Sequence, residues 1–185
     1  IMDGFNSVDT DILAFADADG SVPAPSLATI VRQVQTGATE LSIGSRRHPS
    51  SHIVSHQTIV RRFLGDAFAL VAQQLLPTRC GDYQCGAKAV RADVWAEIRN
   101  YCHERGFAWD LEFVSVAGSL GYDITEVPVV WQDHPDSTVD PIRTSVELAT
   151  ALLAVRRRTR TLTPHRRLQD HPTDHSPYLQ PKDGN

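Results

Sequence analysis

Four short apolar runs predict β-strands, at 11–16, 41–44, 87–90 and 124–131. Gly, Pro, Asp and Ser cluster around these runs, as they do around buried strands. Pro128 cannot donate a ladder hydrogen bond, so the last run is expected at a sheet edge or at a bulge.

Segments with helical periodicity lie between and after these runs. The predicted helices are 26–35, 58–76, 92–100, 107–121 and 142–158. The second and longest carries an apolar face made of Ile59, Phe63, Ala67, Leu70 and Val71. Strands that alternate with helices indicate an α/β layered fold. The first strand lies almost at residue 1, so we expect a preceding N-terminal part of the domain to be missing.

Composition narrows the function classes. The chain has 185 residues, 41% apolar and 22% charged, which fits one globular domain. The 22 acidic residues against 18 basic ones argue against a nucleic-acid partner. No apolar run reaches about 18–20 residues, so no transmembrane helix is predicted. Charge is uneven, because residues 141–185 hold eight basic and four acidic side chains. Beyond residue 163, the Pro, His, Asp and Gln content predicts a disordered tail.

A pair of carboxylates follows the first predicted strand. Asp17 and Asp19 stand one residue apart in a loop, where both can turn toward one hard cation such as Mg²⁺ or Mn²⁺. Ligands of α/β sheets bind at such strand ends. The alternative is that both residues only cap a turn, with Asp19-Gly20 as ordinary turn chemistry.

Three further motifs are candidates for chemistry, each with a structural alternative. Asp82 to Lys88 places a carboxylate, an amide and a cation in one loop, which is also consistent with a plain β-turn. Asp110 stands at a predicted helix start, where a carboxylate also serves as a cap. Trp131 ends an apolar strand and is equally suited to a core.

The order of the motifs is more specific than any one of them. Along the chain stand Asp-Ala-Asp-Gly, Gly-Ser-Arg, Asp-x-Gln-Cys-Gly-x-Lys, Phe-Ala-x-Asp-x-Glu and Glu-x-Pro-Val-x-Trp. This set resembles the family 2 glycosyltransferases, in particular the dolichyl-phosphate (polyprenyl-phosphate) glucose synthases. The resemblance implies a GT-A-like nucleotide-diphosphosugar transferase fold, a Rossmann-like mixed sheet with helices on both faces, here N-terminally truncated. Residues 1–140 would form the C-terminal two-thirds of the catalytic domain, followed by a basic membrane-proximal helix at 141–162 and the tail at 163–185.

The resemblance also implies roles for individual residues in binding the substrates. Asp17 and Asp19 match the motif that holds Mg²⁺ or Mn²⁺ on the diphosphate of the sugar nucleotide. Arg46 matches a residue near the acceptor phosphate, and Arg62, or its neighbour Arg61, matches a second phosphate partner.

Other matched positions surround the sugar. Asp82, Gln84 and Cys85 match the loop that lines the sugar pocket. Asp110 and Glu112 match the catalytic positions beside the sugar.

The implied reaction moves a hexose, by preference glucose from UDP-glucose, to a polyprenyl or dolichyl phosphate with inversion, for protein or surface glycosylation. A phosphate monoester is already ionised at neutral pH, so arginines that position it matter more than a base. Asp110 is therefore expected to orient the sugar. Two alternatives stand beside this function: transfer to a hydroxyl, with Asp110 as the base, and a non-catalytic remnant that binds lipid phosphate or a partner.

A lipid acceptor requires contact with a membrane, so we expect a peripheral protein on the cytoplasmic face. The helix at 145–155 and the arginines after it suit an anchor on anionic lipid. These arginines are Arg156, Arg157, Arg158, Arg160, Arg166 and Arg167. A solvated basic C-terminal region is the alternative.

Overall fold

The computed structural model describes residues 1–54, 59–132 and 141–162, without the side chains of 59–64, 107, 141–143 and 145. The predicted tail at 163–185, with Arg166 and Arg167, lies outside the described residues.

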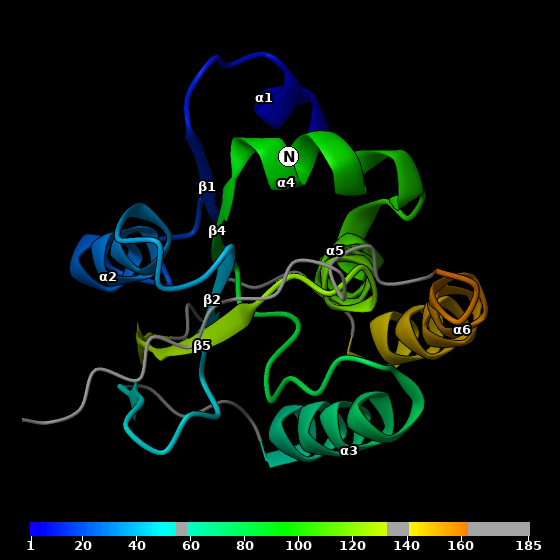
Figure 1. Cartoon of the computed structure of the whole chain (residues 1–185). Coiled ribbons are helices and arrows are strands. Elements are labelled where there is room, and N and C mark those ends of the chain that lie inside the picture. Colours follow the sequence, from blue (N-terminus) through cyan, green and yellow to red (C-terminus); the bar gives the residue numbers. More distant parts are fainter. Residues whose placement is uncertain (55–58, 133–140, 163–185) are drawn as a thin grey trace, which may run out of the picture.

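A four-stranded mixed sheet forms the centre of the domain (Figure 1). Its strands are β1 (Ile12–Ala16), β2 (Leu41–Ser45), β4 (Ala87–Arg91) and β5 (Ile124–Pro128), in the order β1-β4-β2-β5. β4 is antiparallel to both β1 and β2, whereas β2 and β5 are parallel. The carboxyl ends of β1, β2 and β5 therefore lie at the same end of the sheet as the amino end of β4.

The first three predicted strands are confirmed, whereas the fourth, predicted as one strand at 124–131, is divided after Pro128, which ends an edge strand as its chemistry requires. After Pro128 the chain continues into a separate two-stranded ribbon of β6 (Val130–Trp131) and β3 (His52–Ile53).

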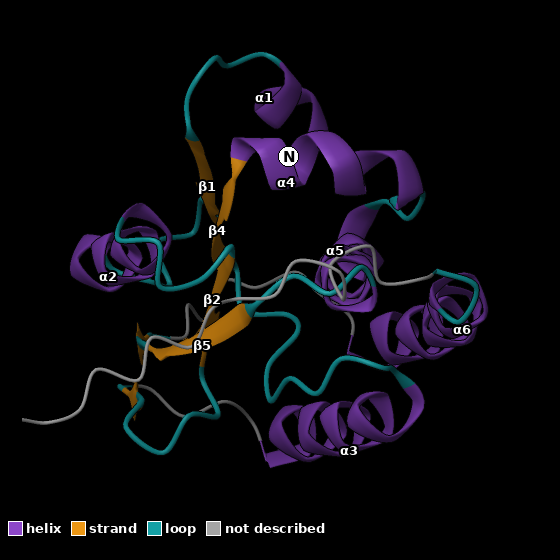
Figure 2. Cartoon of the chain, in the orientation of Figure 1, coloured by secondary structure: helices purple, strands orange, loops and turns teal. Residues whose placement is uncertain are grey.

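Helices cover both faces of the sheet, with α2 on one side and α4 and α5 on the other (Figures 1 and 2). The helices are α1 (Met2–Asn6), α2 (Ala24–Gln35), α3 (Ile59–Leu75), α4 (Ala92–Ile98), α5 (Trp109–Ser119) and α6 (Pro141–Thr159), with single 3₁₀ turns at Arg99–Tyr101 and Gly106–Ala108. The expected mixed sheet with helices on both faces is confirmed. α1 was not predicted, since five residues are too few for a periodic pattern.

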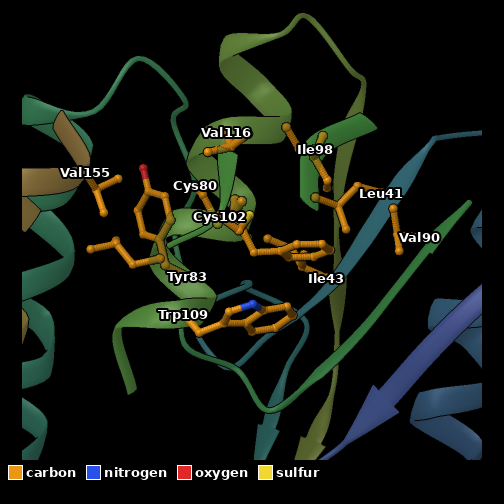
Figure 3. Close-up of a cluster of buried hydrophobic side chains, with 14 of the residues drawn as sticks. Leu41, Ile43, Cys80, Tyr83, Val90, Ile98, Cys102, Trp109, Val116 and Val155 are labelled. Carbon is orange, nitrogen blue, oxygen red and sulfur yellow. The ribbon is translucent and has the colours of Figure 1, made fainter. Parts of the chain in front are cut away.

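The larger core lies between the sheet and the helices of the second face. Leu41, Ile43 and Val90 from β2 and β4 lie in one cluster with Trp109 of α5 and Val155 of α6 (Figure 3). The smaller core joins α2 to the opposite face through residues such as Ile30 and Val127. No helix in the described ranges is long and apolar enough to cross a membrane.

The apolar face predicted for α3 is wrong at the three positions whose side chains the structure describes, Ala67, Leu70 and Val71, which are all exposed. Leu70 and Val71 are 60% and 47% exposed, whereas Ala69 and Ala72 are buried. Phe68 and Leu75 of α3 also pack against the core, so the inward face lies beside the predicted one. Helical periodicity fixed the helix but not which stripe meets the core.

Candidate active site

The charged motifs converge at one end of the sheet, because the carboxyl ends of β1 and β2 and the amino end of β4 lie there. Asp17 directly follows β1, Arg46 directly follows β2, and the loop with Asp82 and Cys85 leads into β4. The hydrogen bond from the Asp17 amide to the Gly86 carbonyl, 2.7 Å long, joins the first segment to the third.

Arg46 and Asp82 form a bidentate ion pair. Nε of Arg46 lies 2.7 Å from Oδ2 of Asp82, and Nη2 lies 2.8 Å from Oδ1. The Arg46 amide also donates to Oδ2, at 3.0 Å. Burial opposes ionisation of Asp82, but the charge and hydrogen bonds of Arg46 outweigh it and hold the pKa of Asp82 well below its ordinary value. Arg46 keeps part of its side chain exposed, so it is oriented by Asp82 and still open to a ligand.

The last sequence motif supports this pair from β5 and β6. Glu126 accepts hydrogen bonds from the amides of Gly81 and Asp82, at 2.9 and 3.1 Å, and so fixes the loop. Trp131 lies under the Arg46 guanidinium, 5.8 Å from its ring centroid, in a cation–π arrangement. The Glu-x-Pro-Val-x-Trp motif therefore positions Arg46 from two sides.

Lys88 and Asp110 form a second ion pair beside the first. Lys88 is 1% exposed, and its Nζ lies 2.7 Å from Oδ1 of Asp110. The same ammonium donates to the Cys85 carbonyl, also at 2.7 Å. This pair ties the start of α5 to the loop before β4.

Asp17 lies close to these groups. Its carboxyl group rests against Gly86, where a Cβ atom would overlap it. Partial burial, and then the negative charges of Asp110 and Asp19, raise the pKa of Asp17 above its ordinary value. Asp19 is exposed, and its Oδ1 accepts a hydrogen bond of 2.9 Å from the Ser21 amide. Asp19 thus has the turn contact expected of the alternative interpretation, while its charge still acts on Asp17.

Cys85 and Gln84 differ in what they offer to the site. Cys85 is fully buried, and burial raises the pKa of its thiol to about 12, so the side chain is an apolar packing group. It fits against Gly44, where a Cβ atom would come within 2.8 Å of Sγ. Gln84 is half-buried, and its backbone N–H donates to Oδ1 of Asp82 at 3.3 Å.

Glu112 is not brought together with Asp110. Positions 110 and 112 lie about 200° apart around a helix, on opposite sides of α5. Glu112 is completely buried, accepts hydrogen bonds from the amides of His103 and Glu104, and pairs with Arg158 of α6. Its observed contacts join α5 to a loop and to α6, away from Lys88.

Two residues in these contacts were given no individual role from the sequence: Lys88, named only as the cation of the Asp82-to-Lys88 motif, and Glu126, which stood only within the last motif. The signal for Lys88 was a lysine within the otherwise apolar run 87–90, and for Glu126 a carboxylate within a strand. Arg62 lies in α3, but its side chain is outside the part of the chain that the structure describes.

The carboxylates fit a divalent cation by chemistry. Asp17 and Asp19 offer hard oxygen ligands, and Gly86 leaves the space that the Asp17 carboxyl needs. Within residues 1–54, 59–132 and 141–162, no group of three His, Cys, Asp or Glu side chains is arranged to hold a metal. The remaining ligands would then come from substrate and water.

Known proteins with similar sequences are named as glycosyltransferases. The chain is 26% identical over 149 residues to "Glycosyltransferase AglD" of Haloferax volcanii, covering 80% of this chain and 24% of that protein. It is 27% identical to the dolichyl-phosphate beta-glucosyltransferase of Dictyostelium discoideum, covering 76% of this chain and 44% of the relative. The chain is related to glycosyltransferases. The mouse dolichyl-phosphate beta-glucosyltransferase is 28% identical, over 79% of this chain and 47% of the relative.

The resemblance found in the ordered motifs is thereby confirmed. The chain spans less than half the length of each of these three relatives. No protein-family model matches the sequence.

A solved structure supports the fold. The glucosyl-3-phosphoglycerate synthase of M. tuberculosis superposes with a TM-score of 0.57 and 19% identity, over 83% of this chain and 53% of that one. The chain therefore shares the fold of a glycosyltransferase.

Proposed function

We propose that the chain is part of a hexosyltransferase that moves glucose from a nucleotide-diphosphate sugar, UDP-glucose by preference, to a polyprenyl or dolichyl phosphate with inversion. The observation that carries the proposal is the convergence of two acidic groups and one oriented arginine at the same end of the sheet. Sequence similarity to dolichyl-phosphate beta-glucosyltransferases is a second observation that supports the proposal.

Asp17 and Asp19 would hold Mg²⁺ or Mn²⁺ on the donor diphosphate. The cation supplies Lewis-acid stabilisation of the charge on the leaving nucleotide diphosphate. The protein contributes a loop in which the Asp17 carboxyl group is set against Gly86, and a bound cation would relieve the repulsion between Asp17 and Asp19.

Arg46 is the residue proposed to bind the acceptor phosphate. A guanidinium has five N–H donors, and the two side-chain bonds to Asp82 use two of them. The Asp82 pair and Trp131 fix its direction before a ligand arrives, which lowers the entropic cost of binding. Ser45, the preceding residue, has a buried hydroxyl without a partner among the described residues, so it is a further candidate donor.

Asp110 is proposed to orient the sugar. An ionised phosphate needs no general base, and one oxygen of Asp110 is already bonded to Lys88. Asp82, Gln84 and Cys85 shape the surroundings of the sugar through the loop that they form. The resemblance implies a catalytic role for Glu112, but the contacts of this side chain do not favour that role. We propose instead that Glu112 holds α6 against α5.

A peripheral position on the cytoplasmic face of the membrane is part of the proposal. Val146, Leu153 and Arg157 on α6, and Arg160 directly after it, are exposed and suit contact with anionic lipid. Arg158 points inward to Glu104 and Glu112, so it is engaged within the domain.

The deciding experiment measures transfer of labelled glucose from UDP-glucose to dolichyl phosphate in vesicles with Mn²⁺. Arg46→Ala is expected to lower kcat/KM by about 100-fold, because a positioned donor to the phosphate is lost. Arg32→Ala on α2 is the control and should leave transfer unchanged. Normal kinetics of Arg46→Ala would reject its role, and transfer to a hydroxyl without lipid phosphate would favour the alternative acceptor.

A further inference from the structure

A second arginine lies beside the Arg46–Asp82 pair. Arg47 comes directly after Arg46, and its Nη1 lies 3.4 Å from Oδ1 of Asp82. Nη2 of Arg46 lies 2.8 Å from the same oxygen. Because both guanidinium groups meet at one carboxylate oxygen, they are close enough for a single phosphate group to contact both.

The two arginines are held with different strength. Arg46 makes two short side-chain bonds to Asp82 and lies over the ring of Trp131. Arg47 extends toward α3 instead, where its Nε lies 3.2 Å from Oδ1 of Asp66. Asp66 is 56% exposed, and an ion pair open to water contributes little to stability. Arg47, which keeps part of its own side chain exposed, can therefore exchange this partner for another anion.

Charge separates the roles of the two arginines. Asp82 is completely buried and matches the charge of one guanidinium, so Arg46, Arg47 and Asp82 together carry one positive charge in excess. Asp66 offsets that excess only weakly, because water screens it. A phosphate monoester is close to a dianion at neutral pH, whereas a phosphodiester carries a single negative charge. The excess charge therefore favours the monoester.

We propose that Arg47 is the second phosphate-binding arginine of the site and makes the site selective for a phosphate monoester over a diester. The inference rests on the proposed function, because it concerns the acceptor phosphate assigned to Arg46. Arg46 supplies donors whose direction is fixed, and Arg47 supplies the additional charge and releases Asp66 when the phosphate binds.

The test is calorimetric binding of two esters to the whole chain at neutral pH, below the concentration at which either forms micelles. Farnesyl phosphate is a short polyprenyl monoester, and its methyl ester keeps the chain but carries one charge. Arg47→Gln is expected to lower the affinity for the monoester at least about tenfold and that for the methyl ester less than about threefold. A purely structural role would weaken both ligands alike, and circular dichroism verifies folding.

Arg91→Gln is the matched control. Arg91 also has an exposed acidic partner, Asp93, but it lies at the other end of β4, so neither affinity should change. Asp66→Asn removes the opposing charge and should raise the preference for the monoester severalfold. If Arg47→Gln does not fold, Asp66→Asn decides, and an unchanged or lower preference overturns the inference.

UDP distinguishes the acceptor phosphate from the donor diphosphate. Arg47→Gln should bind UDP in the presence of Mn²⁺ as tightly as the unchanged chain does. A loss of UDP affinity as large as the loss for farnesyl phosphate would assign Arg47 to the donor and overturn the inference.

The outcomes also separate this inference from the proposed function. If the unchanged chain prefers the monoester and Arg47→Gln keeps that preference, the inference is overturned while the proposed acceptor site stands. Equal binding of the two esters by the unchanged chain also overturns the inference alone. Binding of neither ester by the unchanged chain overturns both.

Discussion

The carboxylate of Asp82 is completely buried and is held by the guanidinium of Arg46, 36 residues away in the sequence. Each residue needs the other, because a buried carboxylate without a cation is costly and an unrestrained arginine is a poor phosphate ligand.

Asp82→Asn is expected to lower the free energy of unfolding at neutral pH by about 3–5 kcal/mol, because breaking a buried pair leaves a charge uncompensated. Urea unfolding measures this. Asp93→Asn, at an exposed partner of Arg91, should cost under about 1 kcal/mol. A loss equal to that of this control would contradict the importance of the buried pair.

The same pair predicts a pH dependence. The folded-state pKa of Asp82 is depressed, so its stabilisation is present above the ordinary aspartate pKa of about 3.9 and is lost as the pH falls through the lower folded value. The difference between the unchanged chain and Asp82→Asn should therefore be largest near neutral pH and shrink below about pH 4. If the difference in unfolding free energy grew on acidification, the direction assigned to the Asp82 pKa shift would be wrong.

Gly86→Ala should displace the Asp17 carboxyl, because the added Cβ atom would overlap it. We expect Mn²⁺ affinity to fall by at least about tenfold, since a ligand position is lost. Calorimetry measures the effect, and Gly4→Ala, which meets no atom within 4 Å, is the control. Undiminished binding would place the cation elsewhere.

Arg158 anchors α6 by pairing with the buried Glu112 and with Glu104. Arg158→Ala should destabilise the fold by about 3 kcal/mol and increase hydrogen exchange in α6. Arg157→Ala, at an exposed position of the same helix, should stay within about 0.5 kcal/mol. Equal effects of the two substitutions would rule out the anchor.

β1 is an edge strand whose sequence, Ile-Leu-Ala-Phe-Ala, holds no charge and no proline. Such an edge favours pairing with another strand. The other edge strand, β5, carries Glu126 and Pro128. We expect concentration-dependent self-association in sedimentation velocity, reduced severalfold by Ala14→Lys. Because Ala14 is exposed, the fold should tolerate the lysine. A monomer at all concentrations would contradict this prediction.

The local pattern of apolar and polar residues was sufficient to predict most helices and strands and the approximate position of the site. Short apolar runs predicted β1, β2, β4 and β5, and the strand-end carboxylates pointed to one end of the sheet. Gly37 and Gly121 follow helix ends, where glycine is favoured because it readily adopts a positive φ, and their φ angles are 73° and 90°. The exposed stripe of α3 was missed, because periodicity gives a face but not its neighbour.

The sequence by itself determined the order of strands and helices, the motifs and their resemblance to glycosyltransferases, because these depend on residues close together in the chain. Only the tertiary structure decided the partners: Arg46 with Asp82, Lys88 with Asp110, and Glu112 with Arg158. The members of each pair lie 22 to 46 residues apart. Which charges meet there depends on sheet order and helix packing, because a buried charge is stable only where the fold supplies its partner.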